Sequence, residues 1–358
     1  MKTCVLHIGK YYEPYLGGME SFTYSLYKEL EKKIDLKVIS YNTIRKTEIL
    51  NEKYKKVIKI SNLFKFRSQP ISISLFFWLK KLLKEVDIVH VHHPNPLVEF
   101  YLLPLLKNKK LIVTYHTDIV RQKFLKKLYS PFLYKFLDKS SHIIATSPNY
   151  VKSSKILQKY KKKVVVIPLG LALDEIRKNK IKDNLDLKKK YGDYILYVGR
   201  LVYYKGVEYL IKSARYIKNN ILIIGTGPLE KKLKKIAPKN VIFLGKVPYL
   251  ELYYQNCKLF VLPSSERTEA FGMVILEAMS FGKPIISTEL GTGTSFININ
   301  GKTGFVVKPK DEKELAKAIN KILCDENLYK KFCKNSLYRV KEFDIKKIAD
   351  SYLRLYYE

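Results

Sequence analysis

The sequence predicts an α/β protein built from two doubly wound parallel sheets, and two observations lead to this prediction. Short apolar runs recur along the chain with little polar alternation, as expected of parallel strands that are covered on both faces. Amphipathic, lysine-rich stretches with helical spacing lie between many of these runs. Repeated strand–helix units of this kind form parallel sheets with helices packed against them.

The expected elements divide evenly between the two halves of the chain. In the first half, strands are predicted at residues 4–8, 37–40, 88–92, 111–115, 143–146 and 164–167. In the second half, they are predicted at residues 194–198, 221–224, 241–244, 259–262, 285–287 and 305–307. Helical patterns between the strands include residues 19–32, 73–84, 206–215, 230–236 and 274–279, and the tail from residue 328 also reads as helical. Six strands in each half indicate two sheets.

The length of 358 residues favours two domains over a single core. We place the first domain at residues 1–170 and the second at residues 171–340. The boundary follows a strand that ends in Ile167-Pro-Leu-Gly170, after which the chain becomes highly charged. Residues 341–358 are expected to form a carboxy-terminal helix that packs back on the first domain.

Net charge and cysteine content indicate the cellular compartment of the protein more than its function. The chain has 67 Lys and Arg against 33 Asp and Glu, a net charge of +34. Such a surface attracts nucleic acid or an anionic membrane leaflet, but solvated helix faces in a lysine-rich chain explain the charge equally well. Four scattered cysteines without a CxxC pair fit a reducing cytosol.

Membrane-spanning segments are not expected. The first apolar run is too short for a signal peptide and is interpreted as a strand. The apolar runs at residues 71–79 and 100–106 fall short of the ~18–20 residues that cross a bilayer. We therefore expect a cytoplasmic protein, either free or held from one side on the cytoplasmic face of the membrane.

Two loops that follow predicted strands have the composition of anion sites. The first contains Tyr15-Leu-Gly17-Gly18 ahead of a helix, where a bare backbone can turn its N–H groups toward an anion or simply form a tight turn. The second is Gly199-Arg200-Leu-Val-Tyr-Tyr-Lys205-Gly206. Its two cations, with a glycine at each end, can reach both phosphates of a diphosphate. In so basic a chain, surface charge is the competing interpretation.

A third loop and helix carry two carboxylates eight residues apart, Glu269 and Glu277. Phe271 and Gly272 lie between them, and Gly272 near a helix start again suggests a backbone site for an anion or a sugar. Glu277 falls within an otherwise apolar helix, where an unpaired carboxylate is costly. We expect it to face a ligand hydroxyl or a fixed cation, whereas a solvated acidic face would require more polar neighbours.

The ordered set of motifs resembles glycosyltransferase family 4, which comprises retaining enzymes of the GT-B fold. The set consists of the Gly-Gly pair, Gly-Arg-x-x-x-x-Lys-Gly and Glu-x7-Glu, with further matches such as Asp87-Ile-Val-His90-Val-His92-His93-Pro94 and Thr114-Tyr-His116-Thr. It extends over about residues 1–325. The resemblance implies two Rossmann-like domains that face each other across a cleft, the first on the acceptor side and the second binding a nucleotide sugar.

The resemblance also implies roles for single residues. Gly17 and Gly18 would lie against the donor diphosphate from the first domain. Arg200 and Lys205, next to Gly199, would neutralise the diphosphate as it leaves.

The remaining implied roles concern the sugar and the nucleoside. Glu269 would hold the sugar hydroxyls, helped by the backbone N–H groups of Phe271, Gly272 and Met273. Val274 would add a backbone contact to phosphate, and Glu277 would bind the ribose. His116 matches a histidine that faces the transferred sugar.

The resemblance implies chemistry without a metal or other cofactor, because the loop cations neutralise the leaving group. His90, His92, His93 and His116 are the residues that would otherwise suggest a metal site, and the sequence places no second group of ligands beside them. The segment Glu289-Leu-Gly-Thr-Gly293 departs from the usual family pattern. It resembles a subset that makes surface polysaccharide, including users of GDP-mannose.

The predicted function is therefore retaining transfer of a hexose-type sugar from a nucleotide diphosphate sugar to a hydroxyl of a glycan or a polyprenyl-linked glycan. Residues 123–137, basic and aromatic, would either rest on an anionic membrane or form a buried helix pair bent at Pro131. A nucleotide-sugar epimerase is the first alternative. A non-enzymatic polyanion-binding protein is the second, although no specific nucleic-acid motif is present.

Overall fold

The computed structural model describes residues 2–12, 17–52, 55–66, 69–119, 123–178 and 186–358. The chain divides into two compact units, each described here by itself. Unit 1 comprises Met1–Gly170 and Ile345–Glu358, and unit 2 comprises Leu171–Asp344. The chain thus returns to unit 1 at Ile345, four residues later than the start at residue 341 expected from the sequence.

Unit 1 contains an eight-stranded sheet in the order β10-β9-β8-β7-β1-β2-β4-β3. Its neighbouring strands are parallel except for the β3–β4 pair. The strands are β1 (Cys4–Tyr11), β2 (Asp35–Tyr41), β3 (Glu48–Glu52), β4 (Lys55–Ile60), β7 (Ile88–His93), β8 (Lys110–Tyr115), β9 (His142–Ala145) and β10 (Val164–Val166). A separate small hairpin pairs β5 (Phe64–Phe66) with β6 (Gln69–Ile71).

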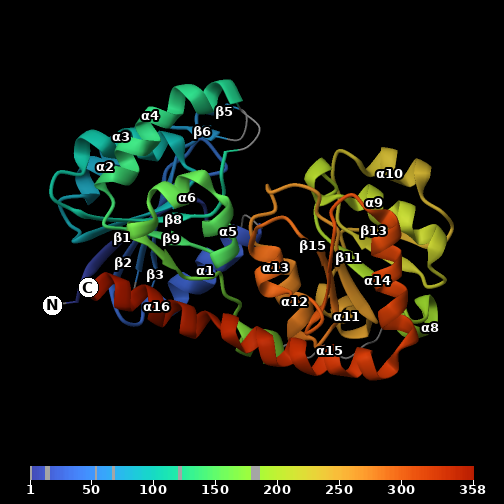
Figure 1. The fold of residues 1–358 in the computed structure, drawn as a ribbon. Coiled ribbons are helices and arrows are strands. Elements are labelled where there is room, and N and C mark those ends of the chain that lie inside the picture. The colour runs from blue at the N-terminus through green and yellow to red at the C-terminus, as the bar shows by residue number, and fades with distance from the viewer. Residues whose placement is uncertain (1, 13–16, 53–54, 67–68, 120–122, 179–185) are drawn as a thin grey trace. The chain divides into compact units, whose positions relative to one another are not determined.

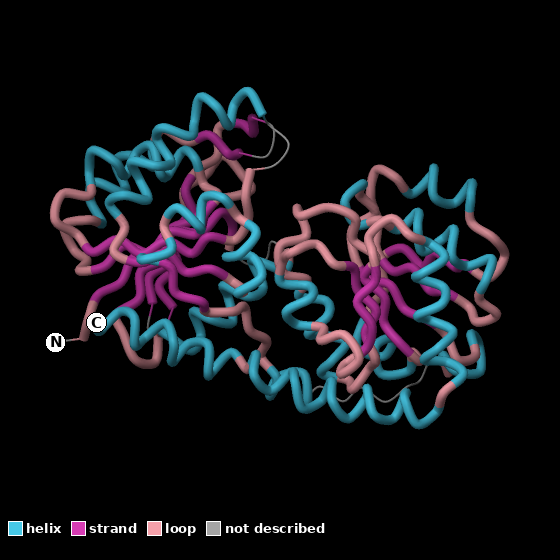
Figure 2. The backbone as a smooth tube through the Cα atoms, viewed as in Figure 1, coloured by secondary structure: helices cyan, strands magenta, loops and turns pink. Residues whose placement is uncertain are grey.

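Helices cover this sheet on both faces, as Figures 1 and 2 show. They are α1 (Gly18–Leu30), α2 (Ser74–Leu82), α3 (Pro96–Leu105), α4 (Lys123–Lys139), α5 (Pro148–Ser153), α6 (Lys155–Lys159) and α16 (Ile345–Tyr357). Helix α16 packs beside α1 and buries Tyr352, Leu355 and Tyr356. Burial of this apolar face anchors the carboxy-terminal segment on unit 1.

Unit 2 contains a six-stranded, fully parallel sheet in the order β13-β12-β11-β14-β15-β16. The strands are β11 (Ile195–Val198), β12 (Ile221–Ile224), β13 (Val241–Gly245), β14 (Leu259–Leu262), β15 (Ile285–Thr288) and β16 (Gly304–Val307). The helices are α7 (Leu173–Lys178), α8 (Leu187–Tyr191), α9 (Val207–Ser213), α10 (Glu230–Ile236), α11 (Leu250–Asn256), α12 (Met273–Ser280), α13 (Gly293–Ile297), α14 (Glu312–Cys324) and α15 (Glu326–Arg339). Strands β11, β12 and β14 are buried at every position, as expected of strands covered on both faces.

The α/β fold class with two doubly wound sheets is confirmed, but two details of the prediction were wrong. Strands β3 and β4 extend the first sheet and were missed by the sequence reading, which expected six strands there. Residues 123–139 form one continuous helix with Pro131 inside it, rather than a bent pair. Among the described helices, none combines the length and the hydropathy needed to cross a membrane.

Candidate active site

The strand order of unit 2 determines where a site can form. Its sheet begins in the middle with β11, continues outward to β13, and returns to add β14 on the other side of β11. The chain therefore reverses direction between β11 and β14, and open α/β sheets bind ligands at the carboxyl ends of strands beside such a reversal. Lys205 follows β11 and Glu269 follows β14, so the two loops singled out in the sequence flank this point.

A nearly buried ion pair joins the two loops. Lys205 Nζ lies 2.6 Å from Glu269 Oε2. The hydroxyl of Ser264, at the end of β14, donates to the same carboxylate oxygen at 3.0 Å. Because both charges are mostly removed from water, each depends on the other for compensation.

Arg200 lies on the β11 loop together with Lys205 but is exposed. Its Nη2 donates to the hydroxyl of Tyr204 at 3.1 Å. The Lys205 Nζ lies 5.8 Å from the centroid of the same tyrosine ring. The Tyr204 ring is therefore next to both cations of the loop.

Gly206 lets the two loops approach each other closely. Its φ of 62° is left-handed, and a Cβ on it would lie 2.1 Å from the carbonyl oxygen of Pro263. The same two loops are also joined by a hydrogen bond, in which the Ser265 N–H donates to the Tyr204 carbonyl at 2.8 Å. Direct contact between the two backbones thus fixes the spacing across which Lys205 meets Glu269.

The loop that follows β15 supports Glu269 from its other side. The Thr292 hydroxyl donates to the Glu269 carbonyl at 2.8 Å, and the Gly293 N–H donates to the Ala270 carbonyl at 2.8 Å. These residues belong to the segment whose sequence departs from the usual pattern. In this chain the segment positions the backbone of the Glu269 loop.

Helix α12 points its first turn at the same region. Gly272 is its N-cap, with a left-handed φ of 90°, and Phe271 precedes it. The N–H groups of Met273 and Val274 belong to the first turn and have no carbonyl partner within the helix. Their partial positive charge faces the carboxyl end of the sheet.

Glu277, one turn further along α12, is half-buried. The hydroxyl of Tyr254 on α11 donates to its Oε2 at 2.8 Å. Burial raises the pKa of Glu277, while the Tyr254 hydrogen bond and the charge of Lys205 oppose that rise. A tyrosine on a neighbouring helix therefore meets the carboxylate for which a ligand or a cation was expected.

Three of the expected site residues belong to unit 1. Gly17 is the N-cap of α1 and Gly18 is its first residue, while residues 13–16 lie outside the described part of the chain. A Cβ on Gly17 would lie 2.3 Å from Glu20 Oε2. A carboxylate of the protein itself therefore lies at the helix start where a diphosphate was expected.

His116 follows β8, is buried, and belongs to a row of imidazoles. Its Nε2 lies 2.9 Å from His92 Nδ1, and burial lowers the pKa of His116 to about 3. His7 on β1 joins the same row, which sequence reasoning missed. Among the described residues, no group of three or more His, Cys, Asp or Glu side chains has an arrangement suited to a metal ion.

Comparison with known proteins identifies the family. The model of Glycosyltransferase Family 4 matches residues 16–175, and that of Glycosyl transferases group 1 matches residues 177–337. The O-antigen chain mannosyltransferase C of Escherichia coli is 35% identical over 98% of this chain and 97% of its own length. The chain belongs to the group 1 glycosyltransferases.

Two further comparisons agree with this assignment. A D-rhamnosyltransferase of Pseudomonas aeruginosa is 39% identical over 70% of this glycosyltransferase and 68% of its own chain. Among solved structures, Anabaena HepE in complex with UDP superposes with a TM-score of 0.75 at 18% identity, covering 99% of both chains. The fold is that of GT-B glycosyltransferases.

The sequence located the charged groups of this glycosyltransferase but missed their partners. Ser264, Tyr204 and Tyr254 each hydrogen-bond to a residue predicted for the site. Ser264 lies two residues after a predicted strand, and this position was an available signal. No sequence signal indicated Tyr254, because it contacts Glu277 from another helix.

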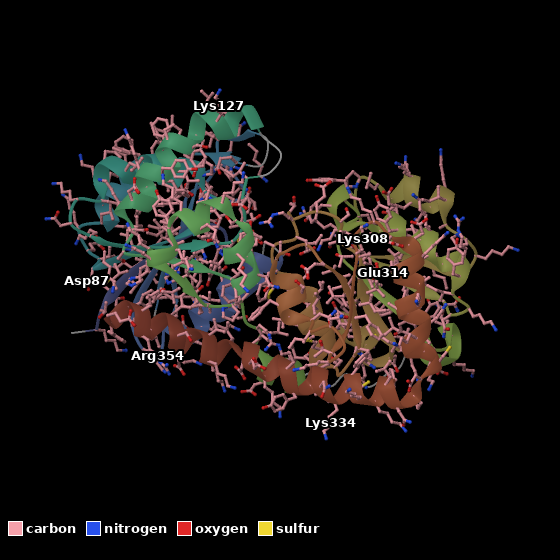
Figure 3. The ribbon with its side chains drawn as sticks, viewed as in Figure 1. Asp87, Lys127, Lys308, Glu314, Lys334 and Arg354 are labelled. Carbon is pink, nitrogen blue, oxygen red and sulfur yellow. The ribbon has the colours of Figure 1, made fainter. Side chains whose placement is uncertain are left out.

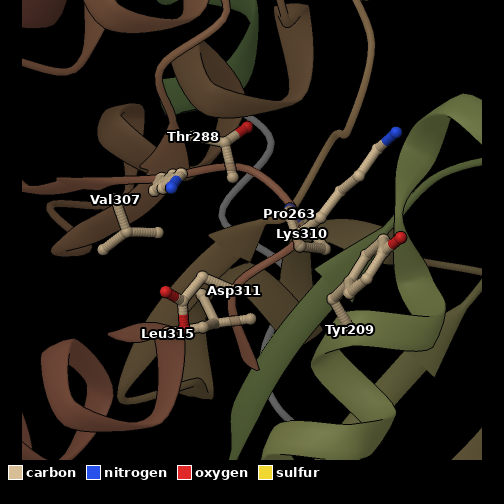
Figure 4. Close-up of a pocket in the computed structure, with 8 residues that line it drawn as sticks. Tyr209, Pro263, Thr288, Val307, Lys310, Asp311 and Leu315 are labelled. Atoms are coloured by element: carbon tan, nitrogen blue, oxygen red, sulfur yellow. The ribbon is translucent and has the colours of Figure 1, made fainter. Parts of the chain in front are cut away.

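A small hollow on unit 2 lies beside this site and shares Pro263 with it. It is formed by α9, the ends of β14 to β16 and the start of α14, as Figure 4 shows. Its lining residues are Tyr209, Pro263, Thr288, Val307, Lys308, Lys310, Asp311 and Leu315. None of the residues predicted for donor binding is among them.

We expect Gly206→Ala to separate the two loops. A methyl group cannot occupy the space held by the Pro263 carbonyl, so the backbones must move apart at a cost of about 1–3 kcal/mol beyond that of the left-handed φ. Gly192→Ala is the matched control, because Gly192 has a similar φ of 67° and nothing within 4 Å of its Cβ position. Thermal unfolding should show the larger loss for Gly206→Ala, and equal losses would contradict the role given to this contact.

Proposed function

We propose that this glycosyltransferase moves a hexose-type sugar from a nucleotide diphosphate sugar to a hydroxyl of a glycan or lipid-linked glycan, with retention of anomeric configuration. Unit 2 binds the donor and unit 1 is the acceptor side. The observation that carries the proposal is the Lys205–Glu269 pair beside Arg200, at the strand reversal of unit 2. It places cations and a carboxylate within one small region, as transfer from a diphosphate requires.

The first requirement is to stabilise the leaving diphosphate. An ammonium group has three N–H donors, and Glu269 takes one of those of Lys205, so two remain for phosphate oxygens. Glu269 also cancels much of the lysine charge, so we assign the guanidinium of Arg200, on the same loop, a share in neutralising the diphosphate. The first-turn N–H groups of α12 add donors that are fixed in advance. Gly17 and Gly18 are proposed to add backbone contacts from unit 1.

The second requirement is to hold the donor sugar and its nucleoside. Both contacts of the Glu269 carboxylate described above use Oε2, so we assign Oε1 to the sugar hydroxyls. By the same argument, Tyr254 occupies Oε2 of Glu277, and Oε1 is assigned to the ribose. His116 is proposed to contact the transferred sugar. A metal ion has no part in this scheme, since the cationic loop and the helix start neutralise the leaving group.

The third requirement concerns stereochemistry. In a front-face reaction, the acceptor oxygen bonds to the anomeric carbon on the side from which the diphosphate leaves. The departing phosphate oxygen takes the acceptor's proton, so no enzyme nucleophile is needed. The membership of the family and the engagement of Glu269 with Lys205 both support this route over attack by the carboxylate.

The decisive test removes each loop cation in turn. We expect Arg200→Ala and Lys205→Ala each to lower kcat by roughly 100- to 1000-fold, the usual effect of losing one preorganised donor to a developing anion. Arg200 is exposed, so its replacement should leave thermal unfolding unchanged. Replacement of Lys205 leaves the Glu269 charge uncompensated, so Lys205→Met combined with Glu269→Gln separates folding from catalysis.

Lys231→Ala, an exposed lysine of α10, is the matched control for charge. Transfer is followed with UDP-, GDP-, ADP- and dTDP-sugars. Near-normal turnover in a folded Arg200→Ala, Lys205→Ala double variant, with any of these donors, would refute the proposal.

The stereochemical prediction has a separate measurement. Proton NMR of the first product formed should show the donor's anomeric configuration, because the acceptor enters on the face that the diphosphate leaves. The spectrum must be recorded before a second transfer. An inverted anomeric centre would exclude retention while leaving the assignment as a glycosyltransferase intact.

Exposed apolar and basic side chains on one face of unit 1 favour the proposal of a lipid-linked acceptor. Helices α2, α3 and α4 pack side by side and expose large apolar side chains, namely Ile73, Phe77, Phe100, Leu128 and Phe132. Leu128 is 59% exposed, and Lys127 and Lys135 of the same helix are also exposed. Figure 3 shows Lys127 extending away from the sheet. Apolar groups interspersed with cations bind an anionic bilayer surface from one side, and we propose that the enzyme docks in this way on the cytoplasmic face of the membrane.

We therefore expect binding to vesicles of phosphatidylcholine and phosphatidylglycerol at low salt, and little binding to phosphatidylcholine alone. Changing Lys127 and Lys135 to Gln should weaken binding roughly thirtyfold, since each lysine near an anionic surface is worth about 1 kcal/mol. Lys231→Gln with Lys235→Gln is the matched control, because both lysines are exposed on α10 of unit 2. Equal loss in the control, or no binding at low salt, would remove this docking surface.

A further inference from the structure

One face of the unit 1 sheet brings together histidines from three segments of the chain. His7 and His90 are register partners on the neighbouring strands β1 and β7. His92 lies two residues beyond His90 and is the register partner of Thr114 on β8, while His116 lies two residues beyond Thr114. Because alternate residues of a strand point to the same face, the four imidazoles form one buried row.

Hydrogen bonds connect this row in series, and a tyrosine from α16 completes it. His116 Nε2 lies 2.9 Å from His92 Nδ1, and His92 Nε2 lies 3.3 Å from His7 Nδ1. The Tyr356 hydroxyl lies 2.7 Å from both His7 Nε2 and His90 Nδ1. The far end is closed by Thr114, whose Oγ1 lies 2.7 Å from His90 Nε2. We call this series the histidine chain.

The histidine chain can exist in only two protonation patterns. Burial lowers the pKa of all four imidazoles, which are therefore neutral. A neutral imidazole has one N–H donor and one acceptor nitrogen, and the tyrosine hydroxyl donates once while accepting once. Every bond must then run in the same direction, so all four protons lie on Nε2 or all four lie on Nδ1. A mixed pattern would set two donors or two acceptors against each other in a buried site.

Tyr356 is the one link inside the chain that is not an imidazole. It couples His90 and Thr114 to the three histidines that lead to His116. His116 engages the chain through Nε2, which leaves Nδ1 outside it. The direction of the chain therefore decides whether Nδ1 carries a proton or a lone pair.

We propose that Tyr356 is a positioning residue that sets the tautomer of His116 through His7 and His92, and with it the hydrogen bond that His116 offers to the transferred sugar. The catalytic consequence rests on the proposed function, which places His116 against that sugar. The hydrogen-bond pattern of the histidine chain does not depend on where the sugar binds. The two parts can therefore fail separately.

Selectively 15N-labelled histidine, observed by long-range proton–nitrogen correlation NMR, reports which ring nitrogen carries the proton. Between about pH 6 and 8 the four chain histidines should be neutral and should show the same tautomer, or the same average of the two. His93 provides an internal reference for a protonated Nδ1, because this atom lies 2.8 Å from the Glu99 carboxylate. Different tautomers among the four histidines of the wild-type enzyme would overturn the inference.

Tyr356→Phe removes the linking hydroxyl and keeps the ring. An unpaired acceptor nitrogen is tolerated better in a buried site than an unpaired N–H. His7, His92 and His116 should therefore all take the Nδ1–H form, whereas His90 should take the Nε2–H form and donate to Thr114. These opposite tautomers are forbidden in the intact chain. Should this variant fail to fold, the wild-type spectrum still decides whether the chain exists.

Tyr352→Phe is the matched control. Tyr352 lies on the same helix, is fully buried, and places its hydroxyl 3.4 Å from Thr114, beyond the end of the chain. It should leave all four histidines alike and turnover within about twofold of wild type. Tyr356→Phe fixes His116 in the Nδ1–H form, so Nδ1 can no longer accept a hydrogen bond from a sugar hydroxyl, and kcat should fall roughly tenfold.

The outcomes distinguish the two proposals. If the tautomers follow this pattern but the wild-type enzyme transfers no sugar, the proposed function is refuted and the histidine chain is supported. If transfer is normal and Tyr356→Phe alters neither the tautomers nor kcat, the positioning role of Tyr356 is refuted.

Discussion

The site of unit 2 depends on the ion pair between Lys205 and Glu269. Two charges that are mostly shielded from water stay in place only while each compensates the other and the remaining lone pairs are satisfied. Ser264 satisfies the carboxylate, and the left-handed Gly206 lets the two loops approach closely enough for the pair to form. The strand reversal between β11 and β14 puts these loops next to each other. Lys205, the cation proposed to serve the leaving diphosphate, is thus positioned by the fold and not by the ligand.

Both units have a strand reversal at which a site can form, but the side chains gathered there differ in charge. In unit 1 the chain reverses between β1 and β7, and the α1 start follows β1 there, while the histidines lie on β1, β7 and just after β8. Unit 2 gathers charged groups at its reversal, and they suit an anionic leaving group. Unit 1 buries neutral imidazoles whose pKa values are lowered by desolvation, and these suit hydrogen bonds to hydroxyl groups. The division of charge between the units parallels the proposed division between donor and acceptor.

Sequence reasoning succeeded where one local pattern determines the structure. Continuous apolar runs located the parallel strands, and motif spacing located Arg200, Lys205, Glu269 and Glu277 at strand ends or on the following helix. It missed β3 and β4 because their charged residues leave only two consecutive apolar residues in each strand, Ile49–Leu50 and Val57–Ile58. It also missed Tyr356, which meets His7 across a separation of 349 residues. Contacts made by tertiary packing leave no periodic signal in either segment.

The composition of the histidine chain has a physical reason of its own. A buried row of asparagine or glutamine amides would have fixed donors and acceptors, so it could be satisfied in one direction only. Imidazole and hydroxyl groups can exchange the two roles, and a row built from them stays fully hydrogen-bonded in either direction. Such a row can adapt Nδ1 of His116, the nitrogen outside the row, to a hydroxyl that donates or one that accepts. Because reversal requires every member to change together, the tautomer of His116 is a property of the whole chain, including a residue on the last helix.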